Sequence, residues 1–302
     1  MKIIGKYKNG NYNVMILNDG TKIRYNNEEN LIPSMPESMD IKINSICDMG
    51  CPMCFEGATI NGDNGDILNA KFIETLHPFT EIAIGGGNPL VHPDLVKFLE
   101  KLKDFKMIPS ITVHQNHFMK NLDFLHYLSD NRLIYGLGIS MVNPTDDFIS
   151  RVKEFPNAVI HVINGITTID QLTKISYNDI KVLILGYKEF GRGKNLFFKY
   201  DNEINKKKND LYESLPYIIA GNWFKAVSFD NLAIKQLDVK RLMDETDWDR
   251  FYMGNDGQYT MFIDLVRNTF STSSTTQFEN RHPILDNIND MFKVIRMENN
   301  YA

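Results

Sequence analysis

Three cysteines lie within eight positions of one another, and the 302-residue sequence contains no others. They are Cys47, Cys51 and Cys54, in the stretch Cys-Asp-Met-Gly-Cys-Pro-Met-Cys. A disulfide between distant parts of the chain is therefore excluded. Three thiolates can hold three irons of a 4Fe–4S cluster and leave the fourth iron open to a ligand that is not protein. The alternatives are three reduced thiols or a zinc loop, which would need a fourth Cys or His ligand.

A glycine run forms a second candidate site. Gly85-Gly86-Gly87-Asn88 follows the apolar stretch 81–84, so it stands at the end of an expected strand. Glycines at that position let backbone groups approach a ligand without interference from Cβ atoms. The G-x4-G-K-[ST] pattern of a phosphate-binding loop is absent. A plain turn is the alternative interpretation.

The elements that must position these residues form an alternating pattern of strands and helices. Apolar periodicity predicts strands near 41–46, 81–84, 110–113, 133–139, 158–163 and 181–185, with helical stretches between them, such as 93–104. Such repetition predicts parallel strands joined by right-handed crossovers. Six units are too few for an eight-stranded barrel, so the expected α/β fold is an open, partial (β/α)6 barrel. The cysteine loop and the glycine run each follow a strand, which places both at the rim where ligands bind.

Two further regions flank this predicted core. The pairs Asn9-Gly10 and Asp19-Gly20 supply hairpin turns for an N-terminal β-meander, and the polar stretch 26–30 and two prolines form a linker. We expect the meander and linker over 1–36, the barrel over 37–200 and an α+β extension over 201–302.

The extension, 201–302, contains no cysteine. In it, the Asp256-Gly257 turn could close a hairpin, and the hydroxyl-rich run 271–276 could cap a helix or face a substrate. Leu285, Ile288 and the apolar residues up to Ile295 have helical spacing.

The Cys-x3-Cys-x2-Cys spacing resembles the radical S-adenosylmethionine (radical SAM) superfamily. The resemblance covers most of the chain and implies one 4Fe–4S cluster whose open iron binds S-adenosylmethionine. Reductive cleavage would then give methionine and a 5′-deoxyadenosyl radical that abstracts hydrogen from a substrate. The glycine run resembles the family's Gly-Gly-Glu-Pro motif, whose backbone meets the amino group of S-adenosylmethionine. Asn88 stands where the family often has glutamate and brings no negative charge.

The resemblance also implies roles for side chains at the other strand ends. The backbone of Met53, between the last two cysteines, would face the adenine. His114, Asn116 and Ser140 have the positions and polar groups expected for contacts with ribose, methionine carboxylate or substrate, although polar loop residues often serve only the local backbone. From its place after the last predicted strand, Lys188 or Arg192 could pair with the methionine carboxylate or an anionic substrate, the alternative being a solvated basic loop. A zinc site at His114 and His117 is disfavoured, since no thiol or carboxylate adjoins them in sequence.

Composition limits the partners. A net charge of −5 gives no basic face for nucleic acid, and no apolar run approaches the length of a membrane span. Reduced thiols and the lack of an apolar signal region predict a cytoplasmic protein. The extension resembles the regions that hold auxiliary clusters in relatives, but no cysteine remains to bind one.

We therefore expect an enzyme that uses a donor such as flavodoxin or ferredoxin and acts on a peptide or on a nucleoside or nucleotide. The alternative is a non-catalytic iron–sulfur or zinc-binding interaction protein on a barrel scaffold.

Overall fold

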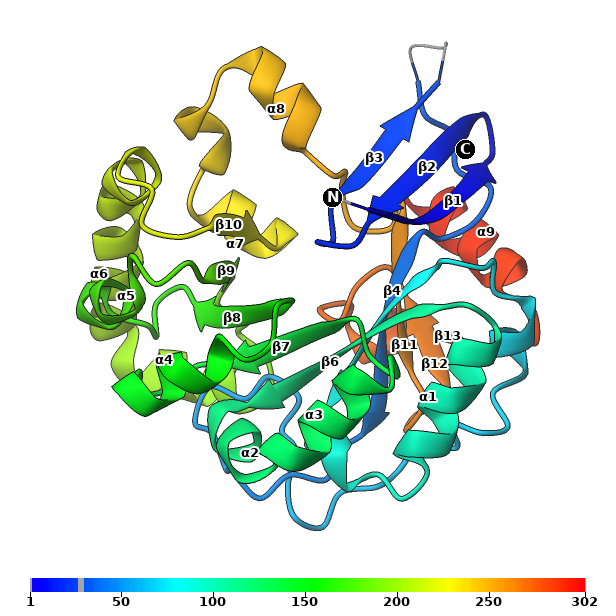
Figure 1. The fold of residues 1–302 in the computed structure, drawn as a ribbon, viewed down its shortest axis with the longest axis horizontal. Helices are drawn as coiled ribbons and strands as arrows, with labels where there is room; N and C mark the ends of the chain where they lie inside the picture. Colours follow the sequence, from blue (N-terminus) through cyan, green and yellow to red (C-terminus); the bar gives the residue numbers. More distant parts are fainter. Residues whose placement is uncertain (1, 27–29, 302) are drawn as a thin grey trace.

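The computed structural model describes residues 2–26 and 30–301, and a ten-stranded sheet dominates them. The sheet curls into an open barrel with a C-shaped outline (Figure 1). Its strand order is β10-β9-β8-β7-β6-β5-β4-β11-β12-β13. The strands are β4 (Ser38–Asn44), β5 (Glu81–Gly86), β6 (Ile108–His114), β7 (Gly136–Ser140), β8 (Ala158–Ile163), β9 (Lys181–Leu185), β10 (Ala226–Phe229), β11 (Thr260–Asp264), β12 (Thr269–Ser271) and β13 (His282–Pro283).

The six strands predicted from sequence are β4 to β9, and each pairs in parallel with its successor along the chain. Two strands of the extension join them in parallel: β10 beside β9, and β11 beside β4. The antiparallel strands β12 and β13 complete the edge next to β11. The partial barrel is thus confirmed and is wider than six strands. The division at residue 200 stays a prediction about domains, although strands from both sides of it form one sheet.

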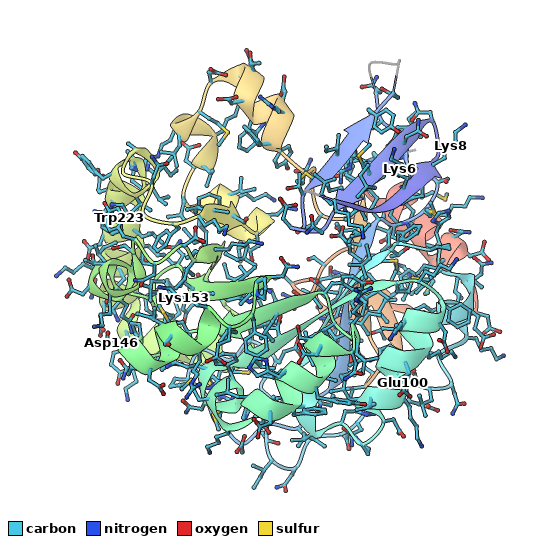
Figure 2. All side chains as sticks on the ribbon, in the orientation of Figure 1. Lys6, Lys8, Glu100, Asp146, Lys153 and Trp223 are labelled. Atoms are coloured by element: carbon cyan, nitrogen blue, oxygen red, sulfur yellow. The ribbon has the colours of Figure 1, made fainter. Side chains whose placement is uncertain are left out.

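Helices cover the outer face of the sheet (Figure 1). The α-helices are α1 (Leu95–Asp104), α2 (Gln115–Lys120), α3 (Leu122–Asp130), α4 (Asp146–Val152), α5 (Ile169–Ile175), α6 (Gly191–Ala220), α7 (Asn231–Gln236), α8 (Glu245–Phe251) and α9 (Ile288–Glu298). Short 3₁₀ turns are η1 (Lys71–Thr75), η2 (Pro89–Val91), η3 (Val239–Leu242) and η4 (Phe278–Asn280). Outward strand residues such as Ile84 and Ile160 are fully buried in the core. Charged side chains such as Glu100 and Lys153 project outward from the molecule (Figure 2).

The N-terminal meander is confirmed as β1 (Ile3–Asn9), β2 (Tyr12–Leu17) and β3 (Lys22–Tyr25), joined by turns at Gly10 and Gly20 with positive φ. A buried carboxylate fastens it to the barrel. Glu37, just before β4, accepts hydrogen bonds from the Tyr12 hydroxyl at 2.5 Å and from Arg24 Nε at 2.9 Å. Lys22 Nζ lies 3.2 Å from the same carboxylate. Of the expected linker, residues 27–29 lie outside the described residues.

In the extension, the apolar stretch near the C-terminus forms α9, which buries Ile288 and Ile295 against the sheet, while Leu285 precedes the helix. The Asp256-Gly257 turn precedes β11 and does not close a hairpin. The chain reverses between β11 and β12 at residues 265–268 instead, with Asn268 at φ 51°.

Among the residues that the structure describes, no helix combines the length and the apolar character that a bilayer crossing needs.

Candidate functional site

The three cysteines lie on the loop that follows β4, and all three are free and partly exposed. Backbone hydrogen bonds shape the loop: Cys47 N–H donates to Thr59 O at 2.8 Å, and Cys54 N–H donates to Cys51 O at 3.1 Å. A parallel bridge pairs Ile46 with Thr59. The loop is therefore a folded unit that presents three thiols at the carboxyl end of the sheet.

The glycine run after β5 packs directly on the segment that leads into this loop. Gly87 N–H donates to Asn44 O at 3.0 Å, and Asn88 N–H donates to Ile46 O at 2.6 Å. A Cβ on Gly87 would lie 2.3 Å from Ile46 O, and one on Gly86 would lie 2.3 Å from Asn44 O. Both glycines are thus required by a close backbone contact. The two motifs that the sequence singled out lie side by side.

Gly85 and Asn88 differ from these two glycines. A Cβ on Gly85 would meet no atom within 4 Å, so the space beside it is open. The Asn88 side chain is buried, and its Oδ1 accepts a hydrogen bond from Leu90 N–H at 3.2 Å. The backbone carbonyl of Asn88 accepts a hydrogen bond from Asn44 Nδ2 at 2.8 Å. Asn88 therefore supports the turn, and its contact with S-adenosylmethionine stays a prediction.

The segment 191–193, Gly-Arg-Gly, clamps the cysteine loop from the other side. Arg192 Nε donates to Cys51 O at 2.9 Å, its Nη1 donates to Ala58 O at 2.9 Å, and its backbone N–H donates to Cys54 O at 3.0 Å. A Cβ on Gly191, whose φ is 51°, would lie 2.4 Å from Phe55 O. The guanidinium group thus binds loop carbonyls, and its contact with the methionine carboxylate or an anionic substrate stays a prediction.

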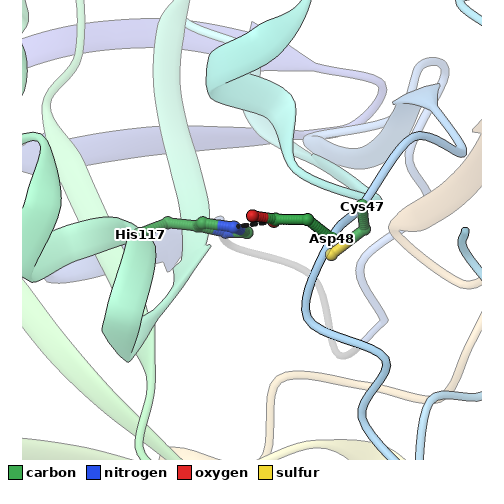
Figure 3. A group of neighbouring side chains, drawn as sticks. All are labelled: Cys47, Asp48 and His117. Atoms are coloured by element: carbon green, nitrogen blue, oxygen red, sulfur yellow. Dashed lines mark hydrogen bonds and ion pairs between the residues drawn. The ribbon is translucent and has the colours of Figure 1, made fainter. Parts of the chain in front are cut away.

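An Asp–His pair anchors the start of the loop. His117 Nε2 lies 2.6 Å from Asp48 Oδ1, and ligand atoms of Cys47, Asp48 and His117 lie within 4.8 Å of one another (Figure 3). His117 is buried, and its Nδ1 has no partner among the described residues. The hydrogen bond from His117 is the main cause that lowers the pKa of Asp48. The sequence did not predict this pair, because 69 positions separate its members.

The remaining predicted residues lie on the same rim. His114 Nδ1 accepts a hydrogen bond from Asn116 N–H at 3.1 Å, and Asn116 Nδ2 lies 3.7 Å from the sulfur of Met49 in the cysteine loop. Burial, followed by the neighbouring His117, lowers the pKa of His114. Ser140 pairs in register with His114 at the end of β7.

Lys188 bridges the cysteine loop and the extension. Its Nζ lies 4.0 Å from the centroid of the Phe55 ring and donates to Ser274 Oγ at 2.9 Å. The hydroxyl-rich run therefore contacts the rim. The Met53 carbonyl lies 3.2 Å from the Cβ position of Gly193, so the Gly-Arg-Gly segment covers its backbone.

A buried ion-pair network holds the far end of the loop. Lys42 Nζ lies 2.6 Å from Glu56 Oε2 and 3.2 Å from Asp264 Oδ2, and Arg281 lies 3.5 Å from Asp264. Lys42 and Asp264 are almost completely buried. The network joins β4, the cysteine loop and β11. Alternation of polar and apolar residues along β4 was the sequence signal that could have revealed it, because buried parallel strands usually read as continuous apolar runs.

The donor set fits a cluster with an open position. Burial is the main cause that raises the pKa of the Cys47 and Cys51 thiols, and the neighbouring thiols raise it further. Metal binding must therefore displace protons from them. In the part of the chain that the structure describes, no fourth thiol exists, and the nearest other donors are Asp48 and His117. The open space at Gly85 leaves room for a ligand at the rim.

Comparison with known proteins shows a similarity of fold. No family model matches the sequence, and no curated protein matches it. The structure of SuiB from Streptococcus suis bound to precursor peptide SuiA superposes with a TM-score of 0.56 at 17% identity, over 86% of this chain and 65% of that chain. The structure of SuiB bound to S-adenosylmethionine superposes with a TM-score of 0.55 at 15% identity, over 90% of this chain and 67% of that chain. This chain thus shares the fold of SuiB and spans about two thirds of its length.

Proposed function

We propose that this chain is a radical SAM enzyme. One observation carries the proposal: the chain's only three cysteines, partly exposed, lie on a loop that packs against the glycine run at the carboxyl end of a parallel sheet. The fold shared with SuiB, a protein whose structure was solved with S-adenosylmethionine bound, supports it. When bound, a reduced 4Fe–4S cluster supplies the electron that cleaves S-adenosylmethionine to methionine and a 5′-deoxyadenosyl radical.

The chain's own residues would hold the cluster and orient S-adenosylmethionine. Cys47, Cys51 and Cys54 would bind the cluster. Arg192 fixes the carbonyls between and beyond these cysteines, and its positive charge lies beside an anionic thiolate site. The backbone at Gly85 offers open space for the amino group of S-adenosylmethionine. His114 and Ser140 stand on neighbouring strands at the same rim and would contact ribose or carboxylate.

The test is anaerobic reconstitution followed by iron and sulfide analysis and an assay for 5′-deoxyadenosine. We expect about four irons per chain and reductive cleavage of S-adenosylmethionine. Cys51→Ala should abolish both, and Lys194→Ala, which removes an exposed lysine after the Gly-Arg-Gly segment, should leave both intact. A reconstituted chain that binds iron and cleaves no S-adenosylmethionine contradicts the proposal.

A peptide is the substrate that the comparison favours. SuiB was solved with a precursor peptide bound, and the shared fold covers most of this chain. A nucleoside or nucleotide is the other candidate, and the net charge of −5 disfavours long nucleic acid. Formation of 5′-deoxyadenosine above the substrate-free rate, measured with each class, separates them. An electron donor such as flavodoxin or ferredoxin would supply the electron for the reaction in the cytoplasm.

The second candidate function is non-catalytic metal binding. The observation that favours it is the group of Cys47, Asp48 and His117, a mixed set of ligands that suits zinc. This hypothesis predicts one zinc per chain, loss of metal in His117→Gln, and no affinity for S-adenosylmethionine. Calorimetric titration of the metal-loaded protein with S-adenosylmethionine separates the two functions.

A further inference from the structure

Lys188 and Ser274 make a contact that joins two distant parts of the curled sheet. Lys188 follows β9, and Ser274 lies in the loop after β12, two strands on opposite sides of the curl (Figure 1). Lys188 Nζ donates a hydrogen bond to Ser274 Oγ at 2.9 Å. The residues proposed to contact S-adenosylmethionine, Gly85, His114 and Ser140, belong instead to the neighbouring strands β5, β6 and β7. The pair therefore lies on a part of the rim that the proposed binding of S-adenosylmethionine does not use.

The positive charge of Lys188 has no negative partner. Its ammonium group contacts the Ser274 hydroxyl and the face of the Phe55 ring, and it forms no ion pair with any carboxylate of the described residues. Lys188 influences Asp40 electrostatically, but Asp40 is exposed to solvent and the two form no ion pair. Lys42, by contrast, lies 2.6 Å from the carboxylate of Glu56. The charge of Lys188, which is only partly exposed, is thus left for a ligand to match.

Both members of the pair have hydrogens left to donate. A lysine ammonium group carries three N–H donors, and Lys188 uses one of them on Ser274. Ser274 Oγ accepts that hydrogen bond, so its own hydroxyl hydrogen is not used there, and none of the described residues accepts it. An anionic oxygen would accept from both groups and would also match the charge.

The loop that carries Ser274 is held in place by Arg281. Arg281 Nε donates to Thr276 O at 3.0 Å, and its Nη2 donates to Ser274 O at 3.2 Å. The side chains on either side of Ser274 bond to each other, because Ser273 Oγ lies 2.8 Å from Thr275 Oγ1. Of these three neighbouring hydroxyls, the one of Ser274 is therefore the one that meets Lys188.

The backbone of Lys188 is fixed as well. A Cβ on Gly193 would lie 2.5 Å from Lys188 O and 3.2 Å from Met53 O, so Lys188 packs closely on the segment that clamps the cysteine loop. Both donors are thus positioned before a ligand binds, which lowers the entropy that binding must cost.

We propose that Lys188 and Ser274 bind an anionic group of the substrate, a carboxylate or a phosphate, beside the ring of Phe55. Its oxygens accept a charge-assisted hydrogen bond from Lys188 and a second hydrogen bond from the Ser274 hydroxyl. Because Phe55 directly follows Cys54, an anion bound there holds the substrate beside the cysteine loop. This inference rests on the proposed function and names the chemistry of its substrate.

The test is calorimetric titration of the reconstituted full chain with two anions, each beside a neutral counterpart. One pair is Nα-acetyl-glutamate amide and Nα-acetyl-glutamine amide, and the other is adenosine 5′-monophosphate and adenosine. We expect one anion to bind roughly tenfold more tightly than its counterpart, since hydrogen bonds to charged groups are the stronger ones. A preference within the first pair assigns a carboxylate of a peptide, and one within the second pair assigns a phosphate.

Substitutions then locate the preference. Lys188→Met keeps an apolar chain against Phe55 and removes the charge, so it should abolish the preference. Lys188→Arg should keep part of it, and Ser274→Ala should reduce it. The matched control is Lys97→Met, an exposed lysine on α1, which should bind as the unaltered chain does. Lys188→Met should melt close to the unaltered chain, because no carboxylate loses its partner; if it melts far lower, Ser274→Ala and Lys188→Arg decide.

Titration with S-adenosylmethionine separates the substrate from the cofactor as the owner of the anion. Lys188→Met should keep its affinity for S-adenosylmethionine. A loss of that affinity, without an anion preference in the unaltered chain, assigns Lys188 to the methionine carboxylate and overturns the proposal. An anion preference that is absent, or that persists in Lys188→Met, overturns it too. An anion preference without formation of 5′-deoxyadenosine defeats the proposed function alone, and cleavage without an anion preference defeats this inference alone.

Discussion

Two positions of the glycine run, Gly85 and Gly87, provide a test of the site that needs only one added methyl group. Gly87→Ala places a Cβ 2.3 Å from Ile46 O and 2.7 Å from Ile46 C. These are backbone atoms in the segment leading into the cysteine loop, so no side chain can rotate away. Gly85→Ala adds the same methyl group where no atom lies within 4 Å.

The expected magnitudes follow from these distances. Overpacking against a fixed backbone costs about 1–3 kcal/mol, and relief of the contact at Gly87 must displace the cysteine loop. At Gly85 the methyl group meets nothing, and the loss of unfolded-state entropy stabilises the chain by about 0.4–1 kcal/mol where the backbone suits alanine. The two variants should thus differ by roughly 1.5–4 kcal/mol in free energy of unfolding.

The assay is urea unfolding of the metal-free chain, which gives the midpoint and the slope for each variant. Binding of S-adenosylmethionine is then measured after reconstitution. Gly85→Ala should keep its stability and its iron and lose affinity for S-adenosylmethionine, because its methyl group fills the open space beside the strand end. Gly87→Ala should lose stability and iron together. Equal unfolding midpoints for the two variants would refute the close contact, and unchanged S-adenosylmethionine affinity in Gly85→Ala would refute the ligand's place.

Three further perturbations address the cysteine loop, His161 on β8 and the carboxylate that fastens the N-terminal meander. Arg192→Lys keeps the charge and loses the fork that binds two carbonyls, so the unfolding free energy should fall by about 1–3 kcal/mol and iron should be released faster to a chelator, with Lys194→Arg as the control. Burial lowers the pKa of His161 from 6.5 to about 4, so about 3 kcal/mol of stability that is present above pH 6.5 is lost as pH falls toward about 4; urea titrations across that range should show this slope, and His161→Gln should remove it. Burial opposes ionisation of Glu37, but Lys22 and Arg24 lower its pKa below 4.5, so its stabilisation is lost as pH falls below that value, and Glu37→Gln should cost about 3 kcal/mol at pH 7 with no such loss on acidification.

The strands were predictable because their signal is local. Alternating apolar stretches of the right length predicted the first and last residues of β8 and β9. The turn pairs that end at Gly10 and Gly20 predicted the meander. The β10 strand has only four residues, Ala226–Phe229, so its alternation of exposed and partly buried side chains is too short to predict a strand. The parallel strand β11 is an apolar stretch in the sequence, but its pairing with β4, over 200 positions earlier, has no local mark.

The candidate site was likewise predictable where its signal is local and unpredictable where contacts join distant parts of the chain. Cysteine spacing and glycine position are properties of short segments, so the sequence could place both on one rim. Arg192 was predicted at the rim, but its partners are the carbonyls of Cys51 and Ala58, and no side-chain pattern encodes a backbone acceptor about 140 positions away. The bond between Asp48 and His117 likewise depends on how two strand ends meet. The type and position of a residue in the sequence predicted that it lies at the rim, but the atoms that it contacts there follow only from the fold.

The β4 strand carries the one long-range feature that its own sequence does encode. Its residues 38–44, Ser-Met-Asp-Ile-Lys-Ile-Asn, alternate polar and apolar side chains, whereas a parallel strand covered on both faces should be apolar throughout. The polar half must therefore face something other than a packed core. Lys42 faces the ion-pair network, Asn44 braces the glycine run, and Asp40 is exposed to solvent. Because Asp40 is exposed while its neighbours Met39 and Ile41 are buried, the alternation along β4 shows that the two faces of this strand meet different surroundings, a packed core on one and water or polar groups on the other.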